Sequence, residues 1–231
     1  MRRLLVMQRI SAAIANNVQW CDLVCRAHDV PTTTRGGVWL ATEKPPELYP
    51  DAITTQPGTT AATVAGLLKG RPGSAVKDSW ADMELSEEGF VELFSARWIS
   101  HEPAQSNAFG LEWSVLDRGG EFGEWEKSAG LRGLLTPELL SEPQVRILSA
   151  RREGTTIGGA IMNRTPSAVG VSNVFSSTDA DRAAIWDDIP AAAGRFFPRY
   201  PLVGYEHGAD LGAALAAGFA EIGSLRIWLR P

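Results

Sequence analysis

Val145-Arg-Ile-Leu-Ser-Ala150 opens the stretch that decides the fold, and two more apolar runs follow it, Thr156-Ile-Gly-Gly-Ala-Ile-Met162 and Ala168-Val-Gly-Val-Ser-Asn-Val-Phe175. Glu153-Gly154 separates the first two runs, and Thr165-Pro-Ser167 separates the last two. Runs of this length, rich in Val and Ile and bounded by Gly, Pro and Ser, are typical of strands. The connections are too short for helical crossovers, so we predict an antiparallel meander of three strands over residues 145–175.

The pattern changes after the third run. Apolar residues recur at helical spacing over residues 179–197, and Pro190 lies inside this helix. A strand is expected at 201–206, a helix at 210–217 and a last strand at 220–229. The strand at 201–206 should lie parallel to the third strand of the meander, because the helix provides a crossover connection.

This order of elements resembles the GNAT acyltransferases, a family that moves an acetyl group from acetyl-CoA to an amine. The stretch from Glu206 to Phe219 is similar to the second helix of that family, which ends in a Gly-Phe pair. Residues 152–160 resemble its first hairpin. The resemblance implies an α/β (α+β) fold with a mixed, mostly antiparallel sheet flanked by helices.

We expect two parts in the chain. A GNAT-like acyltransferase domain would span 109–231 and begin with a strand at 111–116 and a helix at 121–131. The part at 1–104 is an N-terminal α/β unit, and a shortened GNAT-like unit is one interpretation of it. Its expected helices cover residues 4–28, 59–68 (capped by Thr59) and 86–98, and its expected strands cover residues 38–42, 52–55 and 75–83.

Composition excludes several classes of function. The chain has 231 residues, a net charge of −5 and a pI near 5.3, so neither nucleic acid nor an anionic membrane is an expected partner. Two Cys exclude a disulfide scaffold, and no signal-like segment or long apolar run is present. We expect a cytoplasmic protein with a small-molecule substrate, and a homodimer is left open.

The cofactor contacts implied by the resemblance lie where the third strand leads into the next helix. Family members bind the CoA pyrophosphate there through backbone N–H groups of a Gly-rich turn. In this chain the turn, residues 176–182, has no Gly and carries Asp179 and Asp181. With Asp179 interpreted as the helix cap, we predict weak binding of acetyl-CoA. The resemblance assigns the contacts to the following residues: Asn173, Val174, Phe175, Ser176, Ser177 and Arg182.

The catalytic candidates follow the strand at 201–206. Many family members have a Tyr as proton donor four residues before the Gly of the Gly-Phe pair, and Ala214 stands there instead. Glu206 is a candidate general base, with Tyr205 or His207 as the acid. The alternative is an ordinary turn at the end of a strand. Asn173 would either hold an acyl carbonyl or satisfy a bulged backbone.

Cys21, Cys25 and His28 fall on one face of the first helix at a spacing that metal ligands can use. The face is otherwise apolar, so we predict buried thiols and no metal site. Two hypotheses for the function remain at this point. One is an N-acetyltransferase, and the other is a non-catalytic module of the same fold that binds a small molecule or a protein.

Overall fold

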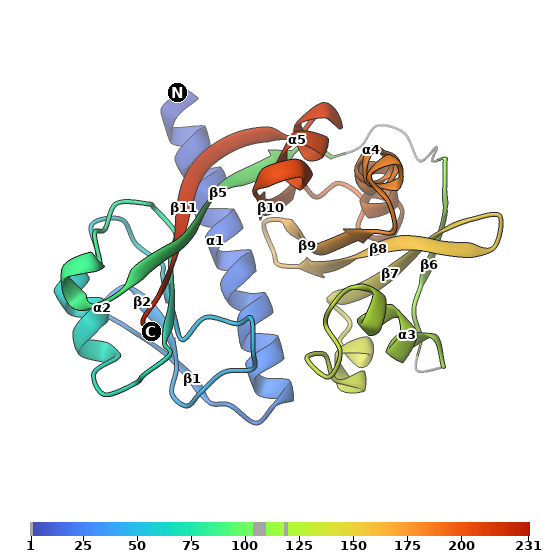
Figure 1. The fold of residues 1–231 in the computed structure, drawn as a ribbon. Coiled ribbons are helices and arrows are strands. Elements are labelled where there is room, and N and C mark those ends of the chain that lie inside the picture. The colour runs from blue at the N-terminus through green and yellow to red at the C-terminus, as the bar shows by residue number, and fades with distance from the viewer. Residues whose placement is uncertain (1, 104–109, 118–119) are drawn as a thin grey trace.

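The computed structural model describes residues 2–103, 110–117 and 120–231. The helices are α1 (Arg2–Ala27), α2 (Ala61–Leu67), α3 (Glu121–Ser128), α4 (Asp179–Phe196) and α5 (Gly208–Ala216), with 3-10 turns η1 (Ser86–Glu88) and η2 (Pro137–Ser141). The strands are β1 (Thr32–Arg35), β2 (Val38–Ala41), β3 (Ala52–Thr54), β4 (Ala75–Asp78), β5 (Val91–His101), β6 (Glu112–Val115), β7 (Val145–Arg152), β8 (Thr155–Arg164), β9 (Val169–Ser176), β10 (Leu202–Glu206) and β11 (Ala220–Leu229). They form one sheet in the order β1-β2-β3-β4-β11-β5-β10-β9-β8-β7-β6 (Figure 1).

The predicted meander is confirmed. Strands β7, β8 and β9 pair antiparallel in sequence order, with Ile147 opposite Ile161 and Ile161 opposite Ser172. Strand β10 pairs parallel to β9, and α4 joins the two with Pro190 inside the helix. The expected first strand and first helix of the C-terminal part are also present, as β6 and α3, and β6 pairs with β7.

The helix predicted over residues 86–98 is wrong. Only Ser86–Glu88 are helical, as η1, and residues 91–101 form the long strand β5. Phe94 and Trp98 are four residues apart, a spacing that fits a helix face and equally fits alternate positions along a strand. Ala96 lies between them and packs in the same apolar cluster as both, as strand alternation requires. The pairing of β5 with both β10 and β11 decides for the strand.

Smaller differences occur elsewhere in the N-terminal part. Residues 32–35, which were not among the expected strands, form β1 in a hairpin with β2. Strand β4 ends at Asp78 and not at Met83. Thr60, and not Thr59, caps α2, because its hydroxyl accepts the N–H of Thr63 at 3.2 Å.

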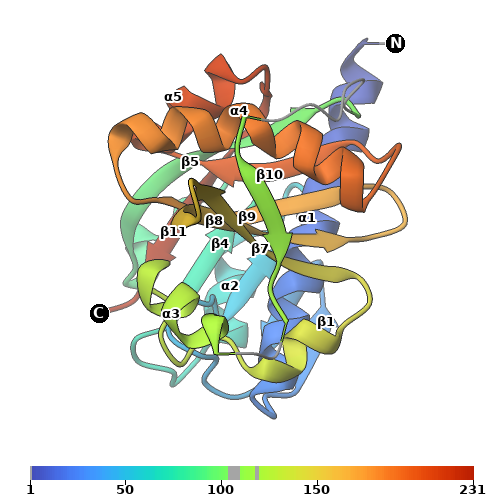
Figure 2. The ribbon, with the colours of Figure 1, turned by 90° about the vertical axis from the view of Figure 1, so that its right-hand side faces the viewer.

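Helices cover both faces of the sheet (Figure 2). Helices α4 and α5 pack on one face, where Ile185, Trp186 and Ile189 contact the apolar side chains of β7, β8 and β9. Helices α1 and α3 pack on the other face, over a second cluster that includes Trp20 and Trp125. Across the described residues no helix combines the length and the apolar character that crossing a membrane would require.

Strands from both expected parts of the chain alternate in this sheet. Strand β5 lies between β10 and β11, and β4 pairs with the other edge of β11. The expected boundary between 1–104 and 109–231 falls in residues 104–109, outside the described residues, so the division into two parts stays a prediction. In this sheet β11 and β5 lie between β4 and β10, and α1 runs along this part of the sheet (Figure 1).

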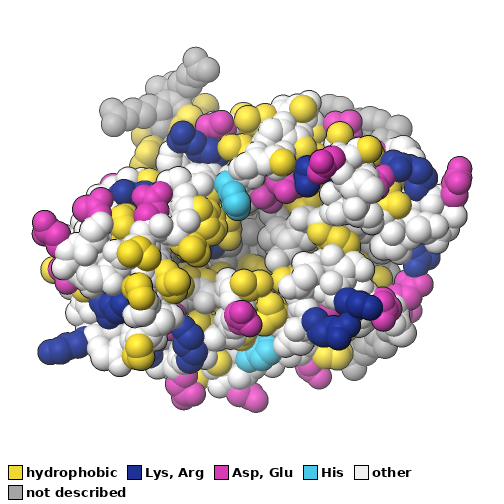
Figure 3. Space-filling view, viewed as in Figure 1, with side chains coloured by type: hydrophobic (Ala, Val, Ile, Leu, Met, Phe, Trp, Pro, Cys, Tyr) yellow, Lys and Arg dark blue, Asp and Glu magenta, His cyan; other side chains and the backbone are white. Residues whose placement is uncertain are grey.

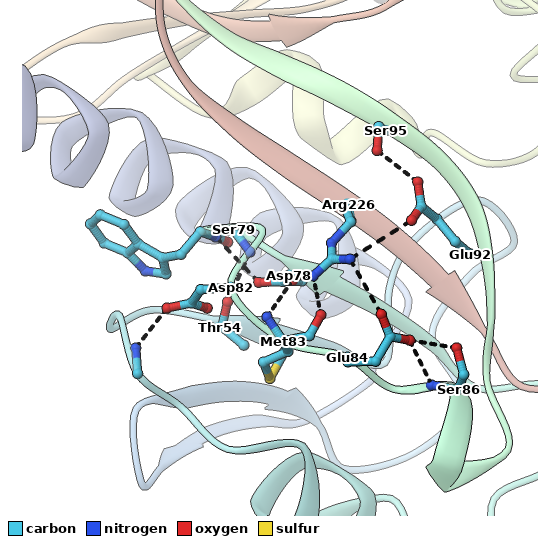
Figure 4. Close-up of polar contacts among 12 residues, drawn as sticks. Thr54, Asp78, Ser79, Asp82, Met83, Glu84, Ser86, Glu92, Ser95 and Arg226 are labelled. Atoms are coloured by element: carbon cyan, nitrogen blue, oxygen red, sulfur yellow. Dashed lines mark hydrogen bonds and ion pairs between the residues drawn. The ribbon is translucent and has the colours of Figure 1, made fainter.

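A polar network anchors the end of β4 (Figure 4). The Arg226 guanidinium on β11 lies 3.5 Å from the Asp78 carboxylate and 3.7 Å from that of Glu84. Asp78 also accepts the backbone N–H of Met83 at 3.2 Å. Burial raises the pKa of Asp78, and these donors oppose the rise. The network fixes the loop after β4 to β11, and with it the backbone position of Lys77.

Candidate functional site

Strands β9 and β10 separate in the middle of the sheet. Their parallel pairing covers only Val169 with Leu202 and Gly170 with Val203, whereas β10 stays paired to β5 as far as Glu206. The backbones are still close at the next position, where a Cβ on Gly204 would meet the carbonyl oxygen of Val171 at 2.7 Å. The separation leaves an opening in the sheet beside the last residues of β10.

Asn173 lies at a bulge on the other side of this opening. Ser172 is opposite Ile161 and Phe175 is opposite Gly159, so two residues of β9 face the single residue Ala160. Asn173 has a φ of 51°, in the left-handed region that few non-glycine residues adopt. The bulge considered for this position is therefore present, and the role of the Asn173 side chain, on the backbone or on an acyl carbonyl, stays a prediction.

A cavity of about 250 Å³ lies under α1 and reaches the opening between β9 and β10. Figure 3 shows this face of the molecule hollowed at its centre, with hydrophobic side chains along the rim. The lining includes all three catalytic candidates, Tyr205, Glu206 and His207, and the cofactor candidates Asn173 and Val174. The structure therefore brings these five predicted residues together.

The carboxyl of Glu206 is strongly perturbed by its surroundings. Burial raises the pKa of its carboxyl from 4.5 to about 8, and the nearby Asp210 carboxylate adds to the rise. Such a group exchanges its proton near neutral pH, as a general base must. Two aromatic contacts position the residues on either side of Glu206. The ring centres of Tyr205 and Trp98 lie 5.5 Å apart in an edge-on contact, and those of His207 and Phe94 lie 4.6 Å apart.

The other predicted cofactor residues lie away from the cavity. Phe175 packs edge-on against Trp125 at 5.2 Å, on the α3 side of the sheet. Ser176 ends β9, and Ser177 donates its N–H to the Ile157 carbonyl at 2.8 Å. Arg182 binds the Asp179 carboxylate at 2.7 Å and lies 3.3 Å from that of Asp210.

Asp179 is not the cap of α4, contrary to the sequence-based prediction. Thr178 is the cap, and its hydroxyl accepts the N–H of Asp181 at 3.1 Å. The Asp181 carboxylate accepts the Thr178 hydroxyl at 2.6 Å and pairs with Arg152 at 2.5 Å. Asp179 is solvent-exposed and pairs with Arg182. Both acidic groups are thus offset by a cation, and the N–H groups of Asp179 and Ala180 have no intrahelical acceptor.

The first helix contributes core packing and one wall of the cavity. Cys21 and Cys25 are buried, as expected, against Trp39, Ala41 and Ile53. A ring nitrogen of His28 lies 2.9 Å from the Leu134 carbonyl oxygen. In the chain as described, no group of three His, Cys, Asp or Glu side chains is arranged to hold a metal ion.

Sequence reasoning missed Lys77, a buried lysine on β4 that lines the cavity. It also missed Asn16 and Asn163, which line the cavity and join α1 to β8 through two hydrogen bonds of 2.9 and 3.2 Å between side chain and backbone. The sequence held little signal for Lys77, because residues 75–78 read Ala-Val-Lys-Asp and a lysine beside an aspartate is ordinarily exposed.

The sequence matches no family model and no curated protein. Among solved structures, a GCN5-related N-acetyltransferase from Kribbella flavida is similar with a TM-score of 0.65 and 14% identity, over 95% of this chain and 96% of that one. A conserved protein of unknown function from Staphylococcus epidermidis also has a TM-score of 0.65, at 11% identity, over 87% and 94% of the two chains. A candidate GNAT-family acetyltransferase from Novosphingobium aromaticivorans has a TM-score of 0.56 and 14% identity, over 91% and 94%. At this identity the likeness shows the fold, which is that of the GCN5-related N-acetyltransferases.

Proposed function

We propose that this protein is an N-acyltransferase that uses acetyl-CoA, with Glu206 as the general base. The observation that carries the proposal is the separation of β9 and β10 beside Glu206. An opening through the sheet gives an acyl donor on the α4 side access to an acceptor in the cavity under α1. Glu206 ends β10 at this opening, and its raised pKa suits proton transfer near neutral pH.

The residues at the start of α4 fit a phosphate group, although modestly. The N–H groups of Asp179 and Ala180 point out of the helix, and the helix dipole favours an anion at this end. The hydroxyl of Ser177 is exposed beside them. The carboxylates of Asp179 and Asp181 are offset by Arg182 and Arg152, so the repulsion expected from the sequence is reduced. These residues would hold the pyrophosphate of acetyl-CoA, which supplies the acyl group as a thioester.

In the proposed reaction, the amine of the acceptor loses a proton to the Glu206 carboxylate as its nitrogen bonds to the acyl carbon. The carbon–sulfur bond breaks, and Tyr205 or His207 returns a proton to the departing sulfur. Both side chains line the cavity beside Glu206. Ala214, at the position of the usual acid in the family, is buried in α5 and has no proton to give.

One observation favours a non-catalytic binding module instead. The turn at 176–182 has no Gly, and the Thr178 side chain already occupies the N–H of Asp181. A module that had lost its cofactor would retain the cavity and the fold, and acetyl-CoA would not change its stability.

The experiment measures thiol release from acetyl-CoA in the presence of a panel of amines, for the parent protein and for Glu206→Gln. The parent rate should rise with pH through about 8, because the base acts as a carboxylate. Glu206→Gln should lower kcat/KM by at least about a hundredfold. An equal rate in both proteins would remove Glu206 from the reaction. If the parent neither releases thiol nor melts at a higher temperature with acetyl-CoA, the binding module is the better description.

A further inference from the structure

Lys77 is a buried cation that faces the cavity without a carboxylate partner. Its side chain is only 3% exposed and lies on β4, under α1. The Nζ atom donates to the Asn17 Oδ1 atom at 2.7 Å and lies 4.2 Å from the centre of the Tyr205 ring. Among the described residues no ion pair involves Lys77, and an ammonium carries three donor hydrogens.

The acidic groups that line the cavity with Lys77 do not supply the missing negative charge. Burial raises the pKa of the Cys21 thiol, and it raises that of the Tyr49 phenol well above the ordinary value, so both stay neutral at physiological pH. Glu206, with its pKa near 8, is mostly protonated at pH 7. A buried charge without a counter-charge is costly, so a ligand that brings an anion would be stabilised here.

The rest of the lining indicates what kind of anion fits. Lys77 is the one Lys or Arg among the described lining residues, which suits a single negative charge better than a phosphate dianion. The Ser172 hydroxyl, on a residue that lines the same cavity, is buried without a hydrogen-bond partner in the described chain. Trp20, Trp98 and Tyr205 contribute aromatic surface, which suits an apolar group on the ligand.

Tyr205 links this cation to the proposed base. Its ring carries Lys77 on one face, and Tyr205 lines the same cavity as Glu206, which lies at the opening of the sheet. A ligand that lies along Tyr205 would therefore place one end at Lys77 and the other near Glu206.

We infer that the acceptor of the proposed transfer is an amine that also carries a carboxylate, of the amino-acid class with an apolar side chain. The carboxylate of this acceptor would bind the Lys77 ammonium, and Asn17 would orient that ammonium. The amino group of the acceptor would point to Glu206. This inference rests on the proposed function for the fate of the amine, but the binding of the carboxylate can be tested without any reaction.

The test is calorimetric titration, without acetyl-CoA, of a panel of apolar L-amino acids and their N-acetyl derivatives, each beside its own carboxamide. At least one acid of the panel should bind, and its amide should bind at least about tenfold more weakly, because it lacks the anion. N-acetyl-L-phenylalanine and N-acetyl-L-phenylalaninamide form the sharpest pair, since they differ by one negative charge.

Lys77→Met should remove the preference for the acid over its amide, and Lys77→Arg should retain most of that preference. Lys69→Met is the control, because this lysine is exposed, and it should leave the preference unchanged. The inference is overturned if no acid of the panel binds, or if acid and amide bind the parent equally. Both results come from the parent protein alone, so they do not depend on whether any variant folds. Binding of the acids by a protein that transfers no acetyl group would instead refute the proposed function and retain the carboxylate site.

Discussion

Replacing Glu206 with Gln should make the protein more stable at high pH, a consequence of the structure that requires no substrate. The carboxyl has a pKa of 4.5 when the chain is unfolded and about 8 when it is folded. The folded state therefore binds the proton more tightly, and the stability of the parent should fall as pH rises from 4.5 through about 8. Gln resembles the protonated acid and does not ionise, so the variant should not show this loss.

The size of the effect follows from the change in pKa. A change of one in pKa corresponds to ~1.4 kcal/mol, so the whole change would correspond to roughly 5 kcal/mol. The carboxyl is partly accessible to water, which reduces the penalty, and we expect a gain of about 2 kcal/mol for the variant above pH 8. In a chain of this size that gain raises the melting temperature by roughly 4–8 °C.

The assay is thermal unfolding of the parent and of Glu206→Gln at pH 5 and at pH 9. The two proteins should melt at similar temperatures at pH 5, and the variant should melt higher at pH 9. Glu112→Gln is the matched control, because this glutamate of β6 is exposed, and it should melt like the parent at both pH values. Equal melting temperatures of parent and Glu206→Gln at pH 9 would show that the carboxyl is not held in a desolvated site.

Three further substitutions test the packing that surrounds the site. Thr178→Ala should cost about 1 kcal/mol in urea unfolding, because the N–H of Asp181 loses its cap; no loss would mean that the cap is not formed in solution. Gly170→Ala should cost roughly 2–3 kcal/mol, since its Cβ would lie 1.8 Å from the Asn16 Oδ1 atom; an unchanged stability would contradict the close contact of α1 with β9. Asp188→Ala should cost about 3 kcal/mol, because two backbone N–H groups and one indole lose their acceptor; a neutral result would show that α4 does not anchor the start of β6.

The sequence predicted the C-terminal half of the sheet because its pairings are local. Strands β7, β8 and β9 follow one another with connections of a few residues, so period and turn residues fix their order. The same reasoning failed for β5, because Phe94 and Trp98 fit two periods and both partners of β5 lie far away in the sequence, at 202–206 and 220–229. Phe94, which a helix over 86–98 would place on the same face as Trp98, is instead partly exposed beside His207.

The candidate site was predictable only in part. Tyr205, Glu206 and His207 stand at the end of one strand, and the resemblance was enough to single them out. Lys77 reaches them because the sheet places β11 and β5 between β4 and β10, an order that no local pattern contains. The pairing of Asp179 with Arg182 was also hidden, because a sequence shows charges and not which side chains offset them.

The central claim is that acetyl-CoA binds with its pyrophosphate at the start of α4. The most direct test is to titrate acetyl-CoA into three proteins: the parent, Asp179→Ala and Asp179→Pro. Ala removes the carboxylate and keeps the backbone N–H, whereas Pro removes both; Pro is tolerated at this first helical position because Thr178 before it is extended. If the pyrophosphate binds at the start of α4, Asp179→Ala should bind more tightly than the parent, and Asp179→Pro several-fold more weakly than Asp179→Ala. Equal affinity in all three proteins, or no binding by any of them, would contradict an acetyl-CoA site between β9 and β10.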